Sequence, residues 1–288
     1  MGFRVYYPVP MASDAHAHPQ DLLKVFPEAE AERRACKVAC AASSWNEAEF
    51  LAQESLSASA KADHAAPMVL CFGVHPQLVL QDPKSVGPSW EYLNKLVAEK
   101  RIASIGEIGF DLFDEDYRAI EGAQERLFRA EISLAVEYSL PVVLHIRKAM
   151  HKVFAYSREL ARLPAVILHS YSGTLREAID LRSRGIQAYF SFGTPIVLNH
   201  KRAMEAVAGL PSETLLVETD APYQALKGSR FPDAKPFSSW SDLTLILHGA
   251  ASLRRAARAG EAEYGVLEKC CDKNFRLAYG LSGNDGIC

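Results

Sequence analysis

Short apolar runs and longer amphipathic segments alternate along the whole chain. Two of the runs, Pro141–His145 (PVVLH) and Ala165–His169 (AVILH), are apolar almost throughout, which is typical of parallel strands buried on both faces. The first run is the weakest, because Pro8 and Pro10 flank it and proline cannot donate to a sheet. The predicted strands are Pro10–Asp14, Lys37–Ala42, Met68–Gly73, Ile102–Ile105, Pro141–His145, Ala165–His169, Ile186–Ser191 and Leu215–Glu218.

The segments between these runs have helical character. Apolar residues recur in Gly122–Tyr138 with close to the period of an amphipathic helix, and Ser43 and Ser44 are suitable N-caps for the segment that follows them. The predicted helices are Trp45–Ala60, Trp90–Lys100, Gly122–Tyr138, Lys148–Arg162, Thr174–Arg184, His200–Gly209, Ser241–Arg258 and Glu261–Tyr279. This alternation predicts a (β/α)8 TIM barrel rather than a doubly wound sheet. Because no linker interrupts the pattern, we expect residues 1–288 to form a single domain.

The composition excludes several classes of protein. With 49% hydrophobic and 23% charged residues, the chain is neither disordered, collagen-like nor a coiled coil. No apolar run approaches the ~18 residues that a membrane helix needs, so no membrane association is expected. Six cysteines in 288 residues are too sparse for a disulfide scaffold, and the N-terminal segment lacks the apolar core of a secretion signal. We therefore expect a cytoplasmic protein, and the sequence implies no obligate protein partner.

The charge balance limits how nucleic acid can be bound. Lys and Arg number 32 against 35 Asp and Glu, which gives a formal charge of -3. This balance argues against a protein that coats nucleic acid by bulk charge. It leaves room for an enzyme that holds a few phosphates locally.

Chemistry-bearing residues gather where the predicted strands end. Asp14, His16 and His18 follow the first strand as Asp-x-His-x-His, and the others are Glu107 after the fourth, His145 ending the fifth, His169 ending the sixth and Asp220 after the eighth. In a TIM barrel these ends form the catalytic face. Four histidines and two carboxylates from five strands are hard to explain as core, since unpaired buried charge is costly. They predict a metal site.

The number of candidate ligands indicates two metals. One cation takes about three or four protein ligands and keeps a position for water. Six candidates therefore suit two divalent cations that share a bridging carboxylate, an arrangement that activates a water and neutralises charge on a phosphoryl or carbonyl oxygen. Because no cysteine is among them, the imidazole and carboxylate set suits Zn, Mn or Mg, and the sequence does not choose between these.

Six motifs carry a resemblance to a known family. In order along the chain they are DAHAH, GVHP, GEIGFD, LHIRKA, HSYSG and ETDAPY. Together they resemble the TatD family of metal-dependent deoxyribonucleases, from about residue 11 to Gly280. The resemblance implies an amidohydrolase-like TIM barrel with a divalent-metal centre that hydrolyses phosphodiester bonds of DNA.

The resemblance also implies roles for individual residues. By motif, His16, His18 and Asp220 correspond to ligands of the first metal, Glu107 to the bridging carboxylate, and His145 and His169 to ligands of the second. Asp220 is then either a ligand alone or also the general base that accepts a proton from water.

The chain departs from the family pattern in two places. Pro19 follows His18 where the family usually has leucine, which a ligand at a strand end tolerates. The family's Arg-Gly-Lys-x-Asn-Glu-Pro-like stretch after the eighth strand is replaced by KGSRFPDAKPFSSWSD, residues 227–242. This loop is expected to shape the substrate cleft, so the departure bears on substrate choice more than on metal binding.

Several further residues have two interpretations each. His75 either contacts a phosphate or protonates the leaving group, as a catalytic residue, or packs as a loop histidine. Arg147 either binds a substrate phosphate or pairs with a neighbouring carboxylate. Asp14 and Glu218 either orient ligand imidazoles and waters or only hydrogen-bond at strand ends. Three aromatic residues either stack on a base or pack at the barrel rim: Tyr171, Tyr223 and Phe110. Two loop cations either contact the DNA backbone or are simply solvated: Lys227 and Arg230.

The favoured function is a divalent-metal-dependent deoxyribonuclease that acts exonucleolytically on single strands, because a narrow barrel mouth admits a frayed end more readily than a duplex. One alternative is a metal-dependent amidohydrolase or lactonase acting on a small molecule. Many such enzymes carry a modified lysine where this chain has Glu107. The second alternative is an inactive barrel that serves as a binding module, which the complete set of candidate ligands disfavours.

Overall fold

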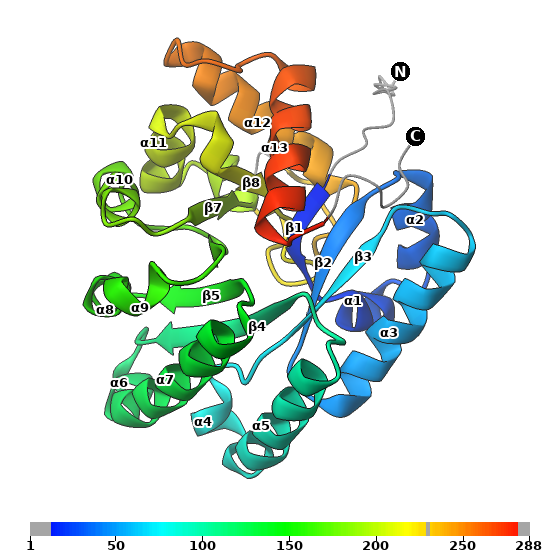
Figure 1. Cartoon of the computed structure of the whole chain (residues 1–288). Coiled ribbons are helices and arrows are strands. Elements are labelled where there is room, and N and C mark those ends of the chain that lie inside the picture. The colour runs from blue at the N-terminus through cyan, green and yellow to red at the C-terminus, as the bar shows by residue number, and fades with distance from the viewer. Residues whose placement is uncertain (1–12, 229–230, 282–288) are drawn as a thin grey trace.

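Eight parallel strands in sequence order form one sheet, and helices surround it (Figure 1). The computed structural model describes residues 13–228 and 231–281. The strands are β1 (Ser13–Ala17), β2 (Ala39–Ser44), β3 (Met68–Phe72), β4 (Ser104–Asp111), β5 (Val142–Arg147), β6 (Val166–Leu168), β7 (Ala188–Phe192) and β8 (Leu215–Val217). The predicted TIM barrel is confirmed.

The ends of the sheet meet through bonds just beyond the last strand. Asp220 donates its backbone N–H to the carbonyl oxygen of His16 at 3.0 Å, and His18 donates to the carbonyl oxygen of Ala221 at 2.8 Å. Two proposed ligand segments, one following β8 and one in and after β1, are therefore joined by backbone hydrogen bonds.

Two strands differ from the prediction in ways that matter for the site. Strand β1 begins at Ser13, so His16 lies within it, and residues 10–12 of the predicted strand lie outside the described residues. Strand β4 begins at Ser104 and extends to Asp111, so Glu107 lies inside the strand rather than after it. Glycine at positions 106 and 109 hid this extension, because glycine is a poor strand former. Elsewhere the strand boundaries shift by one or two residues.

The eight predicted helices are present with shifted ends, and the described residues form four further short helices that the sequence pattern did not predict, over residues 19–25, 29–35, 78–81 and 115–119. The N-cap of the helix after β2 is Asn46, whose side chain accepts from Glu49 N, while Ser43 and Ser44 belong to β2. The helix predicted from Trp90 begins at Pro83 and includes Pro88. The helix predicted over 148–162 is two short ones. The helices are α1 (Pro19–Val25), α2 (Ala29–Ala35), α3 (Glu47–Ala62), α4 (Leu78–Gln81), α5 (Pro83–Ala98), α6 (Glu115–Ala119), α7 (Glu121–Tyr138), α8 (Met150–Ala155), α9 (Ser157–Leu160), α10 (Leu175–Ser183), α11 (Lys201–Gly209), α12 (Asp242–Ala256) and α13 (Tyr264–Ala278), with 3-10 turns η1 (Thr194–Ile196) and η2 (Ser212–Thr214).

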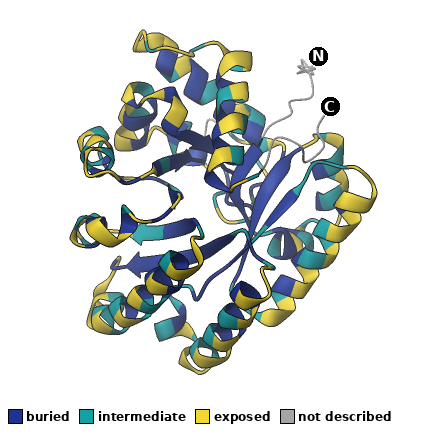
Figure 2. Ribbon diagram, in the orientation of Figure 1, coloured by how far each residue is buried: buried dark blue, intermediate teal, exposed yellow. Residues whose placement is uncertain are grey.

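The hydrophobic core has two parts, and the strands are buried while the helices expose their outer faces (Figure 2). The larger part lies between strands and helices. The smaller one packs small strand side chains, among them Ala41, Cys71 and Val143, against Phe275 and Tyr279 at the end of α13. Tyr279 Oη donates to the carbonyl oxygen of Ala15 at 2.7 Å, which ties α13 to β1. No helix of the described residues is long and apolar enough to cross a membrane.

The alternation of side chains along β5 and β6 places two site residues on the same face as this inner cluster. Val143 and Ile167 belong to the inner cluster, and two residues further along the same strands and their ends stand His145 and His169. Alternate residues of a strand share a face, so both imidazoles project toward the barrel axis. In β1 and β4 the pairing register shifts, between Asp14 and Ala17 and between Ile105 and Ile108. Such irregularities re-aim side chains, here those of His16 and Glu107.

Candidate metal centre

Glu107 lies at the centre of the predicted site, with imidazoles on each side of its carboxylate. Its Oε1 lies 2.6 Å from His169 Nε2, 3.0 Å from His145 Nδ1 and 3.6 Å from His75 Nε2. Its Oε2 lies 3.3 Å from His16 Nε2. These contacts bring side chains from four other segments around one buried carboxylate.

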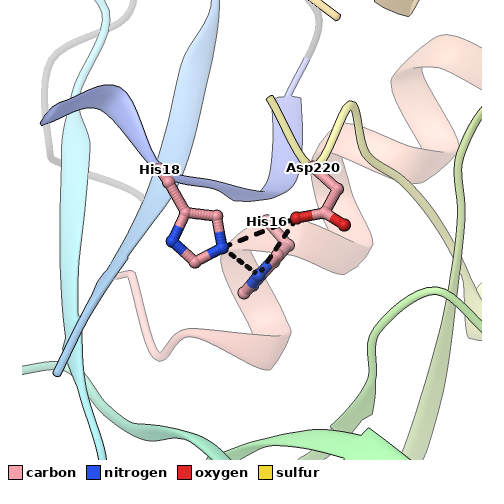
Figure 3. Close-up of side chains that lie close together, drawn as sticks. All are labelled: His16, His18 and Asp220. Atoms are coloured by element: carbon pink, nitrogen blue, oxygen red, sulfur yellow. Dashed lines mark hydrogen bonds and ion pairs between the residues drawn. The ribbon is translucent and has the colours of Figure 1, made fainter. Parts of the chain in front are cut away.

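His16, His18 and Asp220 converge on one another (Figure 3). The two histidines lie on the Oε2 side of Glu107. The two imidazole Nε2 atoms are 3.2 Å apart, and Asp220 Oδ1 lies 3.7 Å from the first and 3.5 Å from the second. His18 Nε2 also lies 3.7 Å from Glu107 Oε2. All six predicted ligands therefore share one site, together with His75.

The donor set fits divalent cations. Three groups of side chains within the described residues each place their ligand atoms within 4.8 Å of one another, and Glu107 belongs to two of them. The groups are His16, His18 and Asp220; His16, Glu107 and His169; and His75, Glu107 and His145. Imidazole nitrogens and carboxylate oxygens without thiolates suit Zn, Mn or Mg rather than a soft-metal site.

Each of three imidazoles has a second polar group behind it, at hydrogen-bond distance for His145 and His16 and at ion-pair distance for His169. His145 Nε2 lies 3.3 Å from Asp111 Oδ2, and His16 Nδ1 lies 3.3 Å from Ser43 Oγ. His169 Nδ1 faces Glu218 Oε1 at 3.6 Å. Such outer contacts fix the ring orientation and leave the opposite nitrogen free to bind a cation.

Asp111 is a functional candidate that the sequence reasoning missed. Its carboxylate is buried, and its Oδ2 accepts from Gln77 Nε2 at 2.6 Å besides facing His145. Burial alone would raise the pKa of this carboxyl, but the hydrogen bonds from His145 and Gln77 lower it to about 2. The residue closes the GEIGFD motif, so the motif contained the signal; the prediction ended β4 too early to place it.

Local backbone features position two of the acidic groups. Gly109 has φ +138°, and a Cβ there would collide with the His145 carbonyl oxygen, so glycine allows β4 and β5 to approach. Asp220 has φ +49°, a left-handed conformation that aspartate tolerates better than most residues. Non-glycine residues in this region are common at functional sites.

Mutual electrostatics stabilise the charged forms of the buried groups. Burial would raise the pKa of Glu107, but His169, His16 and His75 hold it well below its usual value. Burial would likewise lower the pKa of His169, and the Glu107 charge raises it well above the usual value. Glu107 and His169 thus stabilise each other's charged form. Cations and protons therefore compete for the same groups.

The other residues singled out in the sequence have different surroundings in the structure. Asp14 accepts from Thr219 N at 3.0 Å and Thr219 Oγ1 at 2.6 Å, and so ties β1 to the end of β8. Phe110 is fully buried in the core and cannot stack on a base, whereas Tyr171 is buried to 4% exposure but borders the cleft. Of the two loop cations, Lys227 is exposed and Arg230 lies outside the described residues.

Arg147 combines a structural contact with exposure to the cleft. Its guanidinium lies 3.7 Å from the Phe113 ring centre and 3.7 Å from Asp111 Oδ2. The predicted pairing with a neighbouring carboxylate is therefore present. The side chain is still 47% exposed, and it faces the cleft beside His145, so it is free to meet a substrate as well.

A cleft of two lobes opens from the centre. The "basic lobe", about 700 Å³, is lined among others by Arg147, His200, Lys201 and Arg202. The "aromatic lobe", about 520 Å³, is lined among others by Asp21, Trp45, Gln77, Leu78 and Gln81. Both lobes share five lining residues, His145, Arg147, His169, Asp220 and Tyr223, so they meet at the candidate metal centre.

Comparison with known proteins identifies the family. Residues 13–278 match the family described as TatD related DNase. The chain belongs to this TatD family. It is 31% identical to the 3′-5′ ssDNA/RNA exonuclease TatD of Klebsiella pneumoniae over 236 residues, 80% of this chain and 84% of that protein. As a TatD-family protein the chain is a metal-dependent hydrolase of ester bonds.

A second relative and its solved structure agree with this TatD assignment. The uncharacterized metal-dependent hydrolase YjjV of Escherichia coli is 29% identical over 182 residues, 62% of this chain and 67% of that protein. The crystal structure of YjjV, a TatD homologue, superposes with a TM-score of 0.78 and 22% identity, covering 96% of this chain and 100% of that one. The fold of the TatD-family barrel is thereby confirmed.

The segment that carries His75 depends on a buried carboxyl group of α7. Glu131 is fully buried, and its Oε1 accepts from Val74 N at 2.8 Å, next to His75 in the sequence. Burial raises the pKa of Glu131 well above its usual value. Among the described residues its Oε2 has no hydrogen-bond partner. The buried Glu131 carboxyl group therefore holds this segment in place through Val74.

The raised pKa of Glu131 predicts a pH-dependent stability. A carboxyl group whose pKa is raised by folding stabilises the protein fully below its unfolded value, and this contribution is lost as pH rises toward the folded value. Glu131→Gln keeps the acceptor for Val74 without titrating. We expect wild type and variant to be similarly stable near pH 4.5, with the wild type then losing up to about 1.4 kcal/mol per pH unit relative to the variant.

Denaturant unfolding of both proteins at pH 5 and pH 8 measures this difference. The exposed Glu137→Gln serves as control on the same helix. Parallel pH profiles for the wild type and Glu131→Gln would show that Glu131 is ionised in the folded protein.

Proposed function

We propose that this chain is an exonuclease that removes nucleotides from the 3′ end of single-stranded DNA, with two divalent cations held by His16, His18, Glu107, His145, His169 and Asp220. The observation that supports it best is the buried Glu107 carboxylate, shared by imidazoles from both sides, at a mouth that opens into a cleft with cationic side chains. The family and the names of the relatives support the phosphodiester substrate and the polarity.

In this proposal Glu107 bridges two groups of ligands. His16, His18 and Asp220 would hold one cation. His145 and His169, whose inward nitrogens lie 3.3 Å apart and both face Glu107 Oε1, would hold the other. When bound, such a pair of cations activates a water and neutralises charge on the phosphoryl oxygens. The carboxylates of Asp111 and Glu218 support this division, because a proton on the nitrogen that faces each of them leaves the inward nitrogen of His145 and of His169 available to a cation.

Asp220 and His75 are proposed to move the protons. Asp220 accepts a proton from the attacking water, whose oxygen bonds to phosphorus as the bond to the 3′ oxygen breaks. Gln224 Nε2 donates to Asp220 Oδ2 at 3.0 Å and so orients the carboxylate. His75 Nδ1 accepts from Gln77 N at 3.2 Å, which leaves the proton on Nε2, the nitrogen that faces the centre. His75 is thus set to donate to the leaving 3′ oxygen or to the phosphate.

Hydrolysis of end-labelled oligonucleotides tests this function. We expect divalent-metal-dependent release of mononucleotides from the 3′ end of single strands, with slower cleavage of duplexes. Each phosphate contact to a single strand adds about -0.7 to the slope of log affinity against log salt, so the few cations at the cleft predict a shallow slope.

Chelator and substrate controls make this test decisive. Cleavage that persists in excess chelator would contradict the metal mechanism. If no oligonucleotide is cleaved with any divalent metal while amides or lactones are hydrolysed, the chain is an amidohydrolase instead.

A further inference from the structure

The basic lobe is locally cationic although the chain as a whole carries a formal charge of -3. Lys201 and Arg202 begin α11 at its wall, and the sole carboxylate among the described residues that line it is Asp220. Lys201 Nζ lies 3.9 Å from Glu205 Oε1, but both side chains are exposed, so the pair is screened by solvent. In the described part of the chain Arg202 forms no ion pair. Both cations are therefore available to an anionic ligand.

The aromatic lobe is less cationic, because Arg147, which lines both lobes, is its sole Lys or Arg among the described lining residues. Asp21 adds a carboxylate to those of Glu107 and Asp220, while Trp45 and Leu78 provide apolar surface. Tyr223 is 60% exposed and stands edge-on to the His18 ring at 5.1 Å between centres. Its hydroxyl donates to Asp21 Oδ2 at 2.8 Å, which fixes the ring at the mouth of the lobe. This lobe favours an uncharged planar group over a phosphate.

We infer that a single-stranded nucleic acid lies across both lobes in a fixed 5′-to-3′ direction. This inference rests on the proposed function. The basic lobe binds the phosphates on the 5′ side of the scissile bond through Lys201 and Arg202. The aromatic lobe receives the 3′-terminal nucleoside. The terminal nucleotide has no phosphate besides the scissile one, so it needs a stacking surface, whereas the rest of the strand brings one charge per nucleotide.

Charge reversal in the basic lobe tests the path of the strand. The variant is Lys201→Glu with Arg202→Glu, and the matched control is Lys269→Glu with Lys273→Glu, two exposed lysines of α13 that do not line the cleft. Substrates are an eight-nucleotide single strand and a dinucleotide, which contains only the scissile phosphate. In the variant we expect KM for the longer strand to rise at least about tenfold, so that the longer strand loses its lower KM relative to the dinucleotide. The slope of log affinity against log salt should become shallower by about 1.4, because two phosphate contacts are lost. The control should behave as wild type.

Binding decides the inference independently of turnover. Fluorescence anisotropy of a 5′-labelled eight-nucleotide strand, measured in chelator, should show the same weakening and the same loss of salt slope in the basic-lobe variant. If the wild type binds the strand in chelator and the variant binds it less well, but no strand is cleaved when any divalent metal is supplied, the proposed function fails and the path of the strand stands. Equal affinity of wild type and variant, or an equal loss in the control, would overturn the inference.

Strands that carry a terminal phosphate at one end or the other test the direction in which the strand lies across the two lobes. A 3′-terminal phosphate places extra negative charge beside Asp21, so it should raise KM, whereas a 5′-terminal phosphate on an eight-nucleotide strand should not. The reverse preference would overturn the assignment of the lobes.

Discussion

Glu107→Gln should abolish most of the activity by releasing the metals. Five imidazoles have a nitrogen within 3.7 Å of the Glu107 carboxylate, and the amide removes the negative charge that the proposed cations share. Changes to groups that merely orient metal ligands cost about 10–100-fold in affinity or activity. Loss of the bridge should therefore lower turnover by at least ~100-fold and reduce the bound metal below two ions per chain.

Elemental analysis of protein purified without chelator measures the metal content directly, and the oligonucleotide assay measures turnover. Glu137→Gln makes the same chemical change at an exposed position and should alter neither. A Glu107→Gln protein with full activity and two ions per chain would reject Glu107 as the bridge.

Asp220→Asn should lower kcat by about 10²–10⁴-fold, the contribution expected of a general base. Its Oδ1 lies near His18 and His16, while its Oδ2 is held by Gln224. Asparagine keeps an oxygen that can ligate a cation but accepts no proton from water. We therefore expect kcat to stay low even when the metal concentration saturates the site.

The metal titration separates the two roles of Asp220. A residue that is only a ligand would lose affinity for the metal, and excess metal would restore kcat to the wild-type value. Recovery of this kind would contradict the role as general base. Asp116→Asn, at an exposed position of α6 away from the cleft lining, is the matched control.

The sequence determined the fold class and the gathering of the proposed ligands. Runs such as Pro141–His145 are apolar because both faces of a barrel strand are buried, and the chain alternates eight times. Parallel strands place all their carboxyl ends at one mouth, so residues at strand ends had to converge without any knowledge of distances. The same reasoning found His75, from its place just after the third run.

Tertiary structure alone decided how these residues divide and what supports them. Asp111 and Glu131 act through contacts with His145 and Val74 that are distant in sequence, and no local pattern records them. The ends of β1 and β4 also escaped prediction, because proline and glycine obscure strand periodicity while pairing with neighbouring strands extends it. The cationic wall of the cleft depends on where α11 packs after β7. Charge along a sequence does not reveal this, because only packing determines which side chains share one surface.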